Sequence, residues 1–446
     1  MRELGYWVVD RTIEHLATLR DRPAISSAPF DELVAVLGGP PPRQGQPVEE
    51  GLRLLADVAL ENQQHGDHPR FFSRVPGPSS PVGVLGEWLA TGMQSITSSW
   101  GGGSGTATLE VVALGWLRDA LGLPPESEGV LVSGGSMANI TALIAARAHV
   151  GPGLVYVSDQ THSSIVRGLR AMGWTDDQIR VLPTDSSYRL SPDTLREAVA
   201  SDQAAGRQPR IVVGTAGCTN TGSIDDLPGL ADVCAAHGMW LHVDGAYGGP
   251  AALAADRNGI LGLERVDSFA LDPHKWLFQP YDIACVWVAR PGGLERTYAM
   301  HPEYLRDTQA GSMDLHNRGL ELTRRSRAAK LWLTLRTYGL DTLVAAIGRG
   351  ITSGQEAQRL IEQQPDLAIV TPASLGVVTF AVRGLDDAGH SAIAAAITAD
   401  GYAALSSTVL SGRTVLRLCT ISPRTTREDL ERTVELIVTT AASEFR

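Results

Sequence analysis

A regular alternation of short apolar runs with helical segments between residues 129 and 289 constrains the fold more than any other feature. The β-prone runs are GVLVS (129–133), LVYVSD (154–159), IVVGTAG (211–217), MWLHVD (239–244) and DSFALD (267–272). Helical patterns follow the first two runs, over residues 136–148 and 163–172. Apolar strands that alternate with helices are typical of a mostly parallel sheet with helices on its faces. We therefore expect an α/β fold, with IACVWVA (283–289) paired at an edge of the sheet.

The sequence before and after this region predicts further helices. Residues 1 to about 70 are helical and then loop-rich, and helices are expected over 85–96 and 107–121. The glycine cluster WGGGSG (100–105) between those two helices is interpreted as a flexible turn. A long helix is expected over 320–347.

A small C-terminal α/β unit is expected after the long helix. Its predicted strands are GVVTFAV (376–382) and TVLRLC (414–419), and its closing helix covers 429–442. At 446 residues the chain is too long for one ordinary core. We divide it into three parts: residues 1–80, 81–347 and 348–446.

The net charge and the cysteines disfavour several classes of protein. A formal charge of −11 at pH 7 disfavours a general binder of nucleic acid or of anionic membranes. The four cysteines are far apart and form no CxxC pair, so neither a metal site nor a disulfide framework is expected. The first residues lack the apolar core of a secretory signal, and no run approaches the roughly 20 apolar residues of a membrane span. We therefore expect a cytoplasmic protein.

Polar residues cluster where the predicted strands end, which is where a parallel sheet binds its ligands. SGGSMAN (133–139) follows a strand and opens a helix, so its backbone N–H groups suit an anion. His162, Asp244 and Lys275 follow three other strands. Each feature alone has an ordinary explanation, as a glycine turn, a turn carboxylate or a snorkelling lysine. Together they suit one ligand, pyridoxal 5′-phosphate.

In that interpretation the phosphate lies at the start of the helix, and the cofactor's aldehyde forms a Schiff base with Lys275. Asp244 keeps the pyridine nitrogen protonated, and His162 stacks on the ring. The apolar neighbours Trp276 and Leu277 predict a lowered pKa for the amine of Lys275. A nucleotide-binding protein that uses SGGS as a phosphate loop is disfavoured, because the GxxxxGK[ST] pattern is absent.

A series of motifs, ordered along most of the chain, resembles the pyridoxal-phosphate-dependent amino-acid decarboxylases of the aromatic-amino-acid type, often called group II. The motifs are HPRFFSRVPGPSS (68–80), SGGSMAN (133–139), SDQTHSSIVRGL (158–169), GCTNTGSIDD (217–226), HVDGAYGG (242–249), DPHKW (272–276), HPEYL (301–305) and LRLCTISPRTT (416–426).

This resemblance implies the fold-type I, aspartate-aminotransferase-like architecture. Residues 81–347 would form the large cofactor-binding domain with a mostly parallel seven-stranded sheet, and residues 348–446 the small domain. Residues 1–80 would wrap the partner subunit of a homodimer whose active sites lie at the interface. The substrate would be a small molecule, an amino acid.

The resemblance also implies a role for individual residues. Lys275 matches the Schiff-base lysine, Asp244 the partner of the pyridine nitrogen and His162 the stacking imidazole. Thr219 matches a threonine near the cofactor. The phosphate-side positions are matched by Gly135, Ser136, Asp272 and His274. Asp272 departs from the many relatives that carry asparagine, and an anion beside a phosphate needs a proton or an intervening donor.

Tyr304, in HPEYLRDTQAGSMD (301–314), matches the loop tyrosine that looks like the Cα proton donor of the family. Relatives that oxidise the substrate to an aldehyde typically carry phenylalanine at this position. The resemblance therefore implies decarboxylation to an amine and CO2. An oxidative decarboxylation or deamination to an aldehyde, a lyase or an aminotransferase on the same fold stays open.

The substrate side chain is the least constrained part of the prediction. Arg74 and Val75 stand where aromatic-specific relatives carry further aromatics. Thr97 and Ser99 stand where the partner's segment often carries bulky apolar residues, and Trp100 remains. A more polar or roomier pocket is expected, with an aromatic or modified aromatic amino acid favoured. Acidic and aliphatic substrates stay open, since Arg74 suits an acidic side chain and equally a surface position.

Overall fold

The computed structural model describes residues 1–300 and 313–444, which form two compact units. The first unit contains Met1–Pro76, Thr352–Pro372 and Gly376–Arg446. The second contains Gly77–Ile351 and Ala373–Leu375. The division into three parts at residues 80 and 347 stays a prediction.

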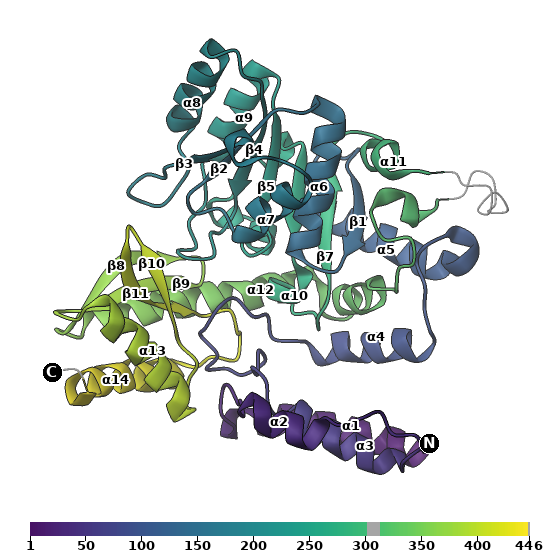
Figure 1. Cartoon of the computed structure of the whole chain (residues 1–446), viewed down its shortest axis with the longest axis vertical. Helices are drawn as coiled ribbons and strands as arrows, with labels where there is room; N and C mark the ends of the chain where they lie inside the picture. The colour runs from purple at the N-terminus through teal and green to yellow at the C-terminus, as the bar shows by residue number, and fades with distance from the viewer. Residues whose placement is uncertain (301–312, 445–446) are drawn as a thin grey trace. The chain divides into compact units, whose positions relative to one another are not determined.

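The second unit is built on a seven-stranded sheet (Figure 1). Its strands are β1 (Glu128–Val132), β2 (Leu154–Ser158), β3 (Ile179–Leu182), β4 (Pro209–Thr215), β5 (Trp240–Asp244), β6 (Ser268–Leu271) and β7 (Ala284–Val288). Their order across the sheet is β1-β7-β6-β5-β4-β2-β3. Strands β2 to β6 pair in parallel, whereas β7 pairs antiparallel with both β6 and β1. Strand β1 therefore runs in the same direction as β6, and the carboxyl ends of all strands except β7 lie at one edge.

The predicted α/β fold with a mostly parallel sheet is confirmed, but the position expected for residues 283–289 is wrong. Strand β7 lies between β1 and β6, and the edges are β1 and β3. Its side chains are all buried, which explains why this run is apolar throughout. Strand β3 was not predicted, because its sequence IRVL is short and carries a charge.

The helices of the second unit are α4 (Pro81–Gly92), α5 (Trp100–Leu121), α6 (Gly135–Val150), α7 (Ser163–Ala171), α8 (Pro192–Ala204), α9 (Leu227–His237), α10 (Pro273–Trp276), α11 (Gly293–Tyr298) and α12 (Ala328–Glu362), the last of which continues into the first unit. Helices α5, α6, α8, α9 and α11 pack against strands of the large sheet. The helix expected over 320–347 is α12, which starts later, extends further and is interrupted at Gly339 with φ 72°.

The glycine cluster at 100–105 is not a flexible turn, because α5 begins at Trp100. The Ser99 side chain caps this helix by accepting a hydrogen bond from the Gly102 N–H. Gly103 has non-helical dihedral angles and kinks the helix. A Cβ at Gly103 would collide with the Ile96 carbonyl oxygen, so this position requires glycine.

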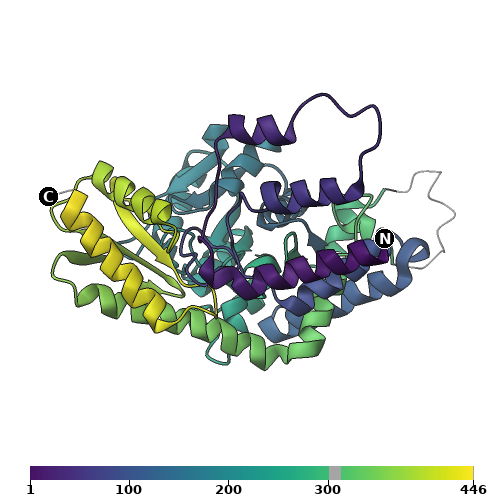
Figure 2. The same ribbon diagram turned by 90° about the horizontal axis from the view of Figure 1, so that it is seen from below.

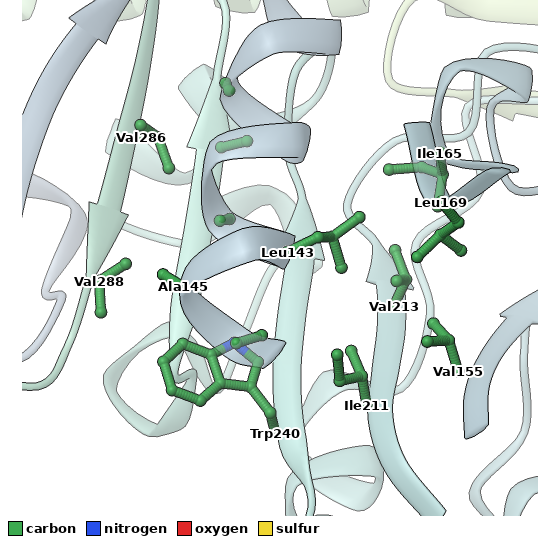
Figure 3. Close-up of a cluster of buried hydrophobic side chains, with 14 of the residues drawn as sticks. Leu143, Ala145, Val155, Ile165, Leu169, Ile211, Val213, Trp240, Val286 and Val288 are labelled. Carbon is green, nitrogen blue, oxygen red and sulfur yellow. The ribbon is translucent and has the colours of Figure 1, made fainter. Parts of the chain in front are cut away.

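The core of the second unit lies between α6 and the sheet (Figure 3). Helix α6 is rich in alanine, so its backbone comes close to the strands. In this cluster Ala145 of α6 points towards Val288 of β7, whereas Leu143 points to the side of Val213 of β4 and Leu169 of α7. The packed helix is thereby held with its N-terminus at the carboxyl edge of the sheet, directly after β1.

The first unit contains a smaller sheet of order β10-β11-β9-β8. Its strands are β8 (Leu367–Ser374), β9 (Val377–Val382), β10 (Ser406–Leu410) and β11 (Arg413–Cys419), and its helices are α1 (Arg2–Thr18), α2 (Phe30–Leu37), α3 (Val48–Leu54), α13 (Asp387–Asp400) and α14 (Arg427–Glu444). Helices α13 and α14 pack side by side, as Figure 2 shows. The N-terminal segment belongs to this unit: Arg20 pairs with Asp429 at 2.6 Å, and the Phe72 N–H donates to the Ala404 carbonyl. Within residues 1–300 and 313–444, no helix is both long and apolar enough to cross a membrane.

Candidate active site

A cavity of about 390 Å³ lies at the carboxyl edge of the large sheet. Segments that follow β1, β2, β4, β5 and β6 form its walls. The residues predicted on the cofactor side all line it: Gly135, Ser136, His162, Thr219, Asp244, Asp272, His274 and Lys275. Other lining residues were not predicted, among them Asn139, Gln160, Ser164, Ala246 and Tyr247. Asn139 lies within the SGGSMAN motif, so a signal for it was present.

Asp244 occupies the end of β5, where its side chain is buried and held by neutral donors. Its Oδ1 accepts a hydrogen bond from the Ala246 N–H at 3.0 Å, and its Oδ2 accepts one from Asn139 Nδ2 at 3.1 Å. Each oxygen of this carboxylate retains a further lone pair for a ligand. Asp244 can therefore accept a hydrogen bond from a protonated ring nitrogen in the cavity.

Lys275 lies in the short helix α10, which begins directly after β6 with Asp272 as its N-terminal cap residue. This turn brings Lys275 Nζ to 3.0 Å from Asp272 Oδ2, and His274 Nε2 lies 3.4 Å from the same oxygen. Burial alone disfavours the charged amine, but the carboxylates of Asp272 and Asp244 outweigh it and raise the pKa of Lys275. The lowered pKa predicted from apolar neighbours is therefore wrong.

The N-terminus of α6 has room for an anion. A Cβ at Gly135 would lie 2.9 Å from Asp272 Oδ2 and 3.1 Å from the Ala246 Cβ, so glycine keeps this wall open. The first-turn N–H groups and the Ser136 hydroxyl are donors at a positive helix end. This donor set fits a phosphate group.

Two buried oxygens at the cavity, Asp272 Oδ1 and Thr215 Oγ1, have no hydrogen-bond partner among the described residues. Buried polar atoms are normally paired, so both fit contact with a bound polar ligand. The cavity thus combines the Lys275 amine, the Asp244 carboxylate and an anion-binding helix end, a set that fits pyridoxal 5′-phosphate.

His162 is the N-terminal cap residue of α7, and its ring is exposed at the cavity. Its Nδ1 accepts a hydrogen bond from the Ser164 N–H at 3.3 Å and lies 2.7 Å from Ser164 Oγ. These two contacts hold the ring by one edge, so that a face stays available for stacking.

The structure does not gather the residues predicted for the substrate pocket. Thr97, Ser99 and Trp100 precede or begin α5, and none of them is among the described residues that line the cavity. Arg74 and Val75 belong to the first unit. Arg74 is exposed, with φ 56°, and its Nη1 donates to Gln64 Oε1 at 3.1 Å.

Tyr304, the predicted proton donor, lies outside the described residues. Its predicted role is therefore carried by the sequence motif HPEYL alone.

The chain is similar to known proteins over most of its length. The profile of the pyridoxal-dependent decarboxylase conserved domain matches residues 55–383. The chain is 39% identical over 446 aligned residues to an aromatic-L-amino-acid decarboxylase of Bacillus atrophaeus, which covers 96% of this chain and 93% of that protein. It is 31% identical to a phenylacetaldehyde synthase of Arabidopsis thaliana, with 98% and 95% covered. The crystal structure of Oryza sativa TDC with PLP and tryptamine superposes with a TM-score of 0.95 at 28% identity, with 100% of this chain and 98% of that chain covered.

Proposed function

Because the chain belongs to the pyridoxal-dependent decarboxylase family, we propose that it removes the carboxylate of an aromatic L-amino acid as CO2 and releases the amine. One observation carries this proposal: the Lys275 amine, the Asp244 carboxylate and the N-terminus of α6 face one cavity of about 390 Å³. The cofactor, when bound, supplies an aldehyde that reacts with amines and a ring that accepts the electrons left by CO2.

We assign each residue of the cavity one task. Lys275 anchors the cofactor through its amine until the substrate amine replaces it. Asp244 accepts a hydrogen bond from the pyridine N–H and thereby stabilises its positive charge, and His162 covers one face of the ring. Ser136 and the N–H groups that follow Gly135 bind the phosphate. Thr219, Asp272 and His274 complete the walls around these groups.

The aromatic substrate class rests on the similarity to an aromatic-L-amino-acid decarboxylase and on the resemblance to a structure that carries tryptamine. An acidic substrate would need a cationic partner in its pocket. Arg74 is a weak candidate for that partner, because its guanidinium is exposed and already donates to Gln64. The aromatic class is therefore favoured over the acidic one.

The relatives also include a phenylacetaldehyde synthase, so the product has to be assigned. We propose that Tyr304 supplies the proton to Cα, which gives an amine. Its replacement by phenylalanine would remove that proton donor; O2 and water would then convert the amino acid into an aldehyde, with CO2, ammonia and hydrogen peroxide as the other products. Tyr304→Phe is expected to lower amine formation and to raise aldehyde and peroxide. Unchanged amine output from this variant excludes the role.

We further propose that the enzyme is a cytoplasmic homodimer. Leu85 and Leu89 share one face of α4 and are 55% and 65% exposed, and Met93, the C-terminal cap residue of this helix, is 72% exposed. An apolar stripe of this kind suits burial against a second copy of the chain. The segment 97–100 that follows α4 would then contribute to the partner's substrate pocket. Cys218, Cys234 and Cys285 are buried thiols, in keeping with a reducing compartment.

The proposed function is tested on the purified protein loaded with pyridoxal 5′-phosphate. Tryptophan, tyrosine, phenylalanine and 3,4-dihydroxyphenylalanine are compared with glutamate and leucine for CO2 release and for amine by mass spectrometry. At least one aromatic substrate is expected to outperform glutamate and leucine. Lys275→Ala is expected to lose both turnover and the visible absorption of the covalently bound cofactor. CO2 release from glutamate or leucine alone would overturn the substrate class.

A further inference from the structure

A buried chain of hydrogen bonds runs from Asp244 into the core of the second unit. Asn139 of α6 donates through Nδ2 to Asp244 Oδ2, and its Oδ1 lies 2.9 Å from His242 Nε2. His242 Nδ1 lies 2.9 Å from Ser268 Oγ, which accepts from Trp240 Nε1 at 2.8 Å. Asn139, His242, Ser268 and Trp240 are all 1% exposed or less. We call these four residues the Asp244 relay.

The strand pattern explains why these side chains meet. Trp240, His242 and Asp244 alternate along β5, so they project from the same face of the sheet. Ser268 lies opposite His242 in the register of β5 with β6. Asn139 reaches the same face from α6, which packs on β5 and β6.

The chemistry of Asp244 and Asn139 determines the first bonds of the relay. An ionised Asp244 only accepts, so Asn139 presents its NH2 group to Asp244 and its carbonyl to His242, whose Nε2 must carry a proton. Burial lowers the pKa of His242 to about 4, so the imidazole is neutral at pH 7 and its Nδ1 accepts from the Ser268 hydroxyl. That hydroxyl oxygen in turn accepts from the indole N–H of Trp240.

The two donors act on the charged form of Asp244. Asn139 Nδ2 and the Ala246 N–H each donate to one of its oxygens, and a carboxylate accepts such bonds more strongly than a neutral carboxyl group does. Asn139, oriented by His242, therefore stabilises the carboxylate and fixes the direction of its oxygens.

We propose that Asn139 and His242 are positioning residues that hold Asp244 ionised and oriented, so that the pyridine nitrogen of the cofactor stays protonated. The proposal rests on the proposed function for the identity of the cofactor. It gives a function to His242, which shares a face of β5 with Asp244 but does not line the cavity.

The first test measures the protonation state of the His242 ring directly. The full-length protein is labelled with 15N-histidine, and the ring nitrogens of His242, assigned by loss of its signals in His242→Gln, are recorded by NMR with and without pyridoxal 5′-phosphate. The relay predicts the neutral Nε2–H form in both states. The Nδ1–H form, or a charged ring at neutral pH, would overturn the proposal.

The second test uses Asn139→Asp, which replaces the donating amide with an acceptor of equal size. Loss of this charge-assisted hydrogen bond is expected to weaken cofactor binding at least about tenfold in a spectral titration. With cofactor labelled with 15N at the ring, the pyridine nitrogen signal should move towards the unprotonated position. Ser268→Ala, two links further away, should shift both readouts in the same direction by a smaller amount.

Thr141→Val is the matched control, because Thr141 lies on the same helix, is fully buried and has no hydrogen-bond partner for its Oγ1 among the described residues. It should leave both the affinity and the nitrogen signal unchanged. A pyridine signal in Asn139→Asp equal to that of the parent, or an equal shift in Thr141→Val, would overturn the proposal. A parent protein with a protonated, relay-dependent pyridine nitrogen that releases no CO2 would instead overturn the proposed function and leave the relay standing.

Discussion

Two buried carboxylates lie in the same cavity, and the protein holds them in opposite ways. Asp244, at the end of β5, accepts hydrogen bonds from two neutral donors, Asn139 Nδ2 and the Ala246 N–H. Asp272, at the end of β6, lies 3.0 Å from the amine of Lys275. Neutral donors orient a carboxylate without cancelling its charge, whereas the lysine compensates the charge of Asp272. Asp244 is therefore available to a cationic atom of the ligand, whereas Asp272 is paired with Lys275.

Replacement of Asp244 should have the largest effect on turnover. Asp244→Asn removes the negative charge that stabilises a protonated pyridine nitrogen, and its new NH2 group faces the relay as a second donor. We expect kcat to fall roughly 10²–10³-fold, as when one electrostatic stabiliser of an active site is lost. Steady-state kinetics at saturating cofactor measure the effect, and the same substitution at Asp272 serves as the control. Turnover equal to that of the parent would remove Asp244 from the reaction.

The buried imidazole of His242 should make the free energy of unfolding depend on pH. Burial lowers the pKa of His242 to about 4, whereas the unfolded chain titrates near its ordinary value of about 6.5. As the pH falls between these values, the unfolded state binds a proton that the folded state does not. The free energy of unfolding should therefore fall, by about 3 kcal/mol over the full interval.

Urea unfolding at pH 7 and pH 4.5 measures this loss in the parent and in His242→Gln. The variant should lose less stability between the two pH values and should also bind the cofactor more weakly. His68→Gln is the matched control, because burial also lowers the pKa of His68 to about 4, and this residue belongs to the other unit. It should flatten the acid profile and leave the cofactor affinity unchanged. Identical acid profiles of the parent and His242→Gln would contradict the assignment.

A methyl group added next to Asp272, at the end of β6, should have a smaller effect on the enzyme. A methyl group at Gly135 would lie 2.9 Å from Asp272 Oδ2, which has to move away from it. Gly135→Ala is expected to weaken cofactor binding by about 1–3 kcal/mol, the usual cost of overpacking. Gly115→Ala in α5 is the control, since a Cβ there has nothing within 4 Å. If Gly135→Ala binds the cofactor as tightly as the parent does, the Asp272 side chain can move away from the added methyl group without weakening binding.

Some features of the cavity could be predicted from the sequence, and others could not. Carboxyl ends of parallel strands meet at one edge, so residues separated by more than 100 positions, such as Gly135 and Lys275, could be expected in one cavity. The sheet and these strand ends follow from apolar periodicity and glycine turns. Which donors face Asp244 depends on the register of β5 with β6 and on the packing of α6, and neither is readable from local patterns.

The pKa of Lys275 was predicted in the wrong direction for a related reason. The prediction weighed the apolar neighbours Trp276 and Leu277. The deciding group is Asp272, three residues earlier, and a turn of helix α10 places its carboxylate against the amine.

Asp272→Asn should give the smallest effect and the sharpest contrast, because it should improve one property. A carboxylate at the phosphate wall repels the phosphate, so removing its charge should tighten cofactor binding, by about fivefold for one pair of like charges in water. The same change removes the nearest anion from Lys275, so the pKa of its amine should fall and covalent capture of the cofactor at pH 8 should be faster.

Equilibrium titration with pyridoxal 5′-phosphate and stopped-flow absorbance measure these two quantities separately. In Asp244→Asn the affinity should fall instead, so the two aspartates should respond with opposite signs. If Asp272→Asn binds the cofactor more weakly, its carboxylate must share a proton with the phosphate rather than repel it. The tighter binding of the parent should then grow as the pH falls, because that proton is taken up on binding.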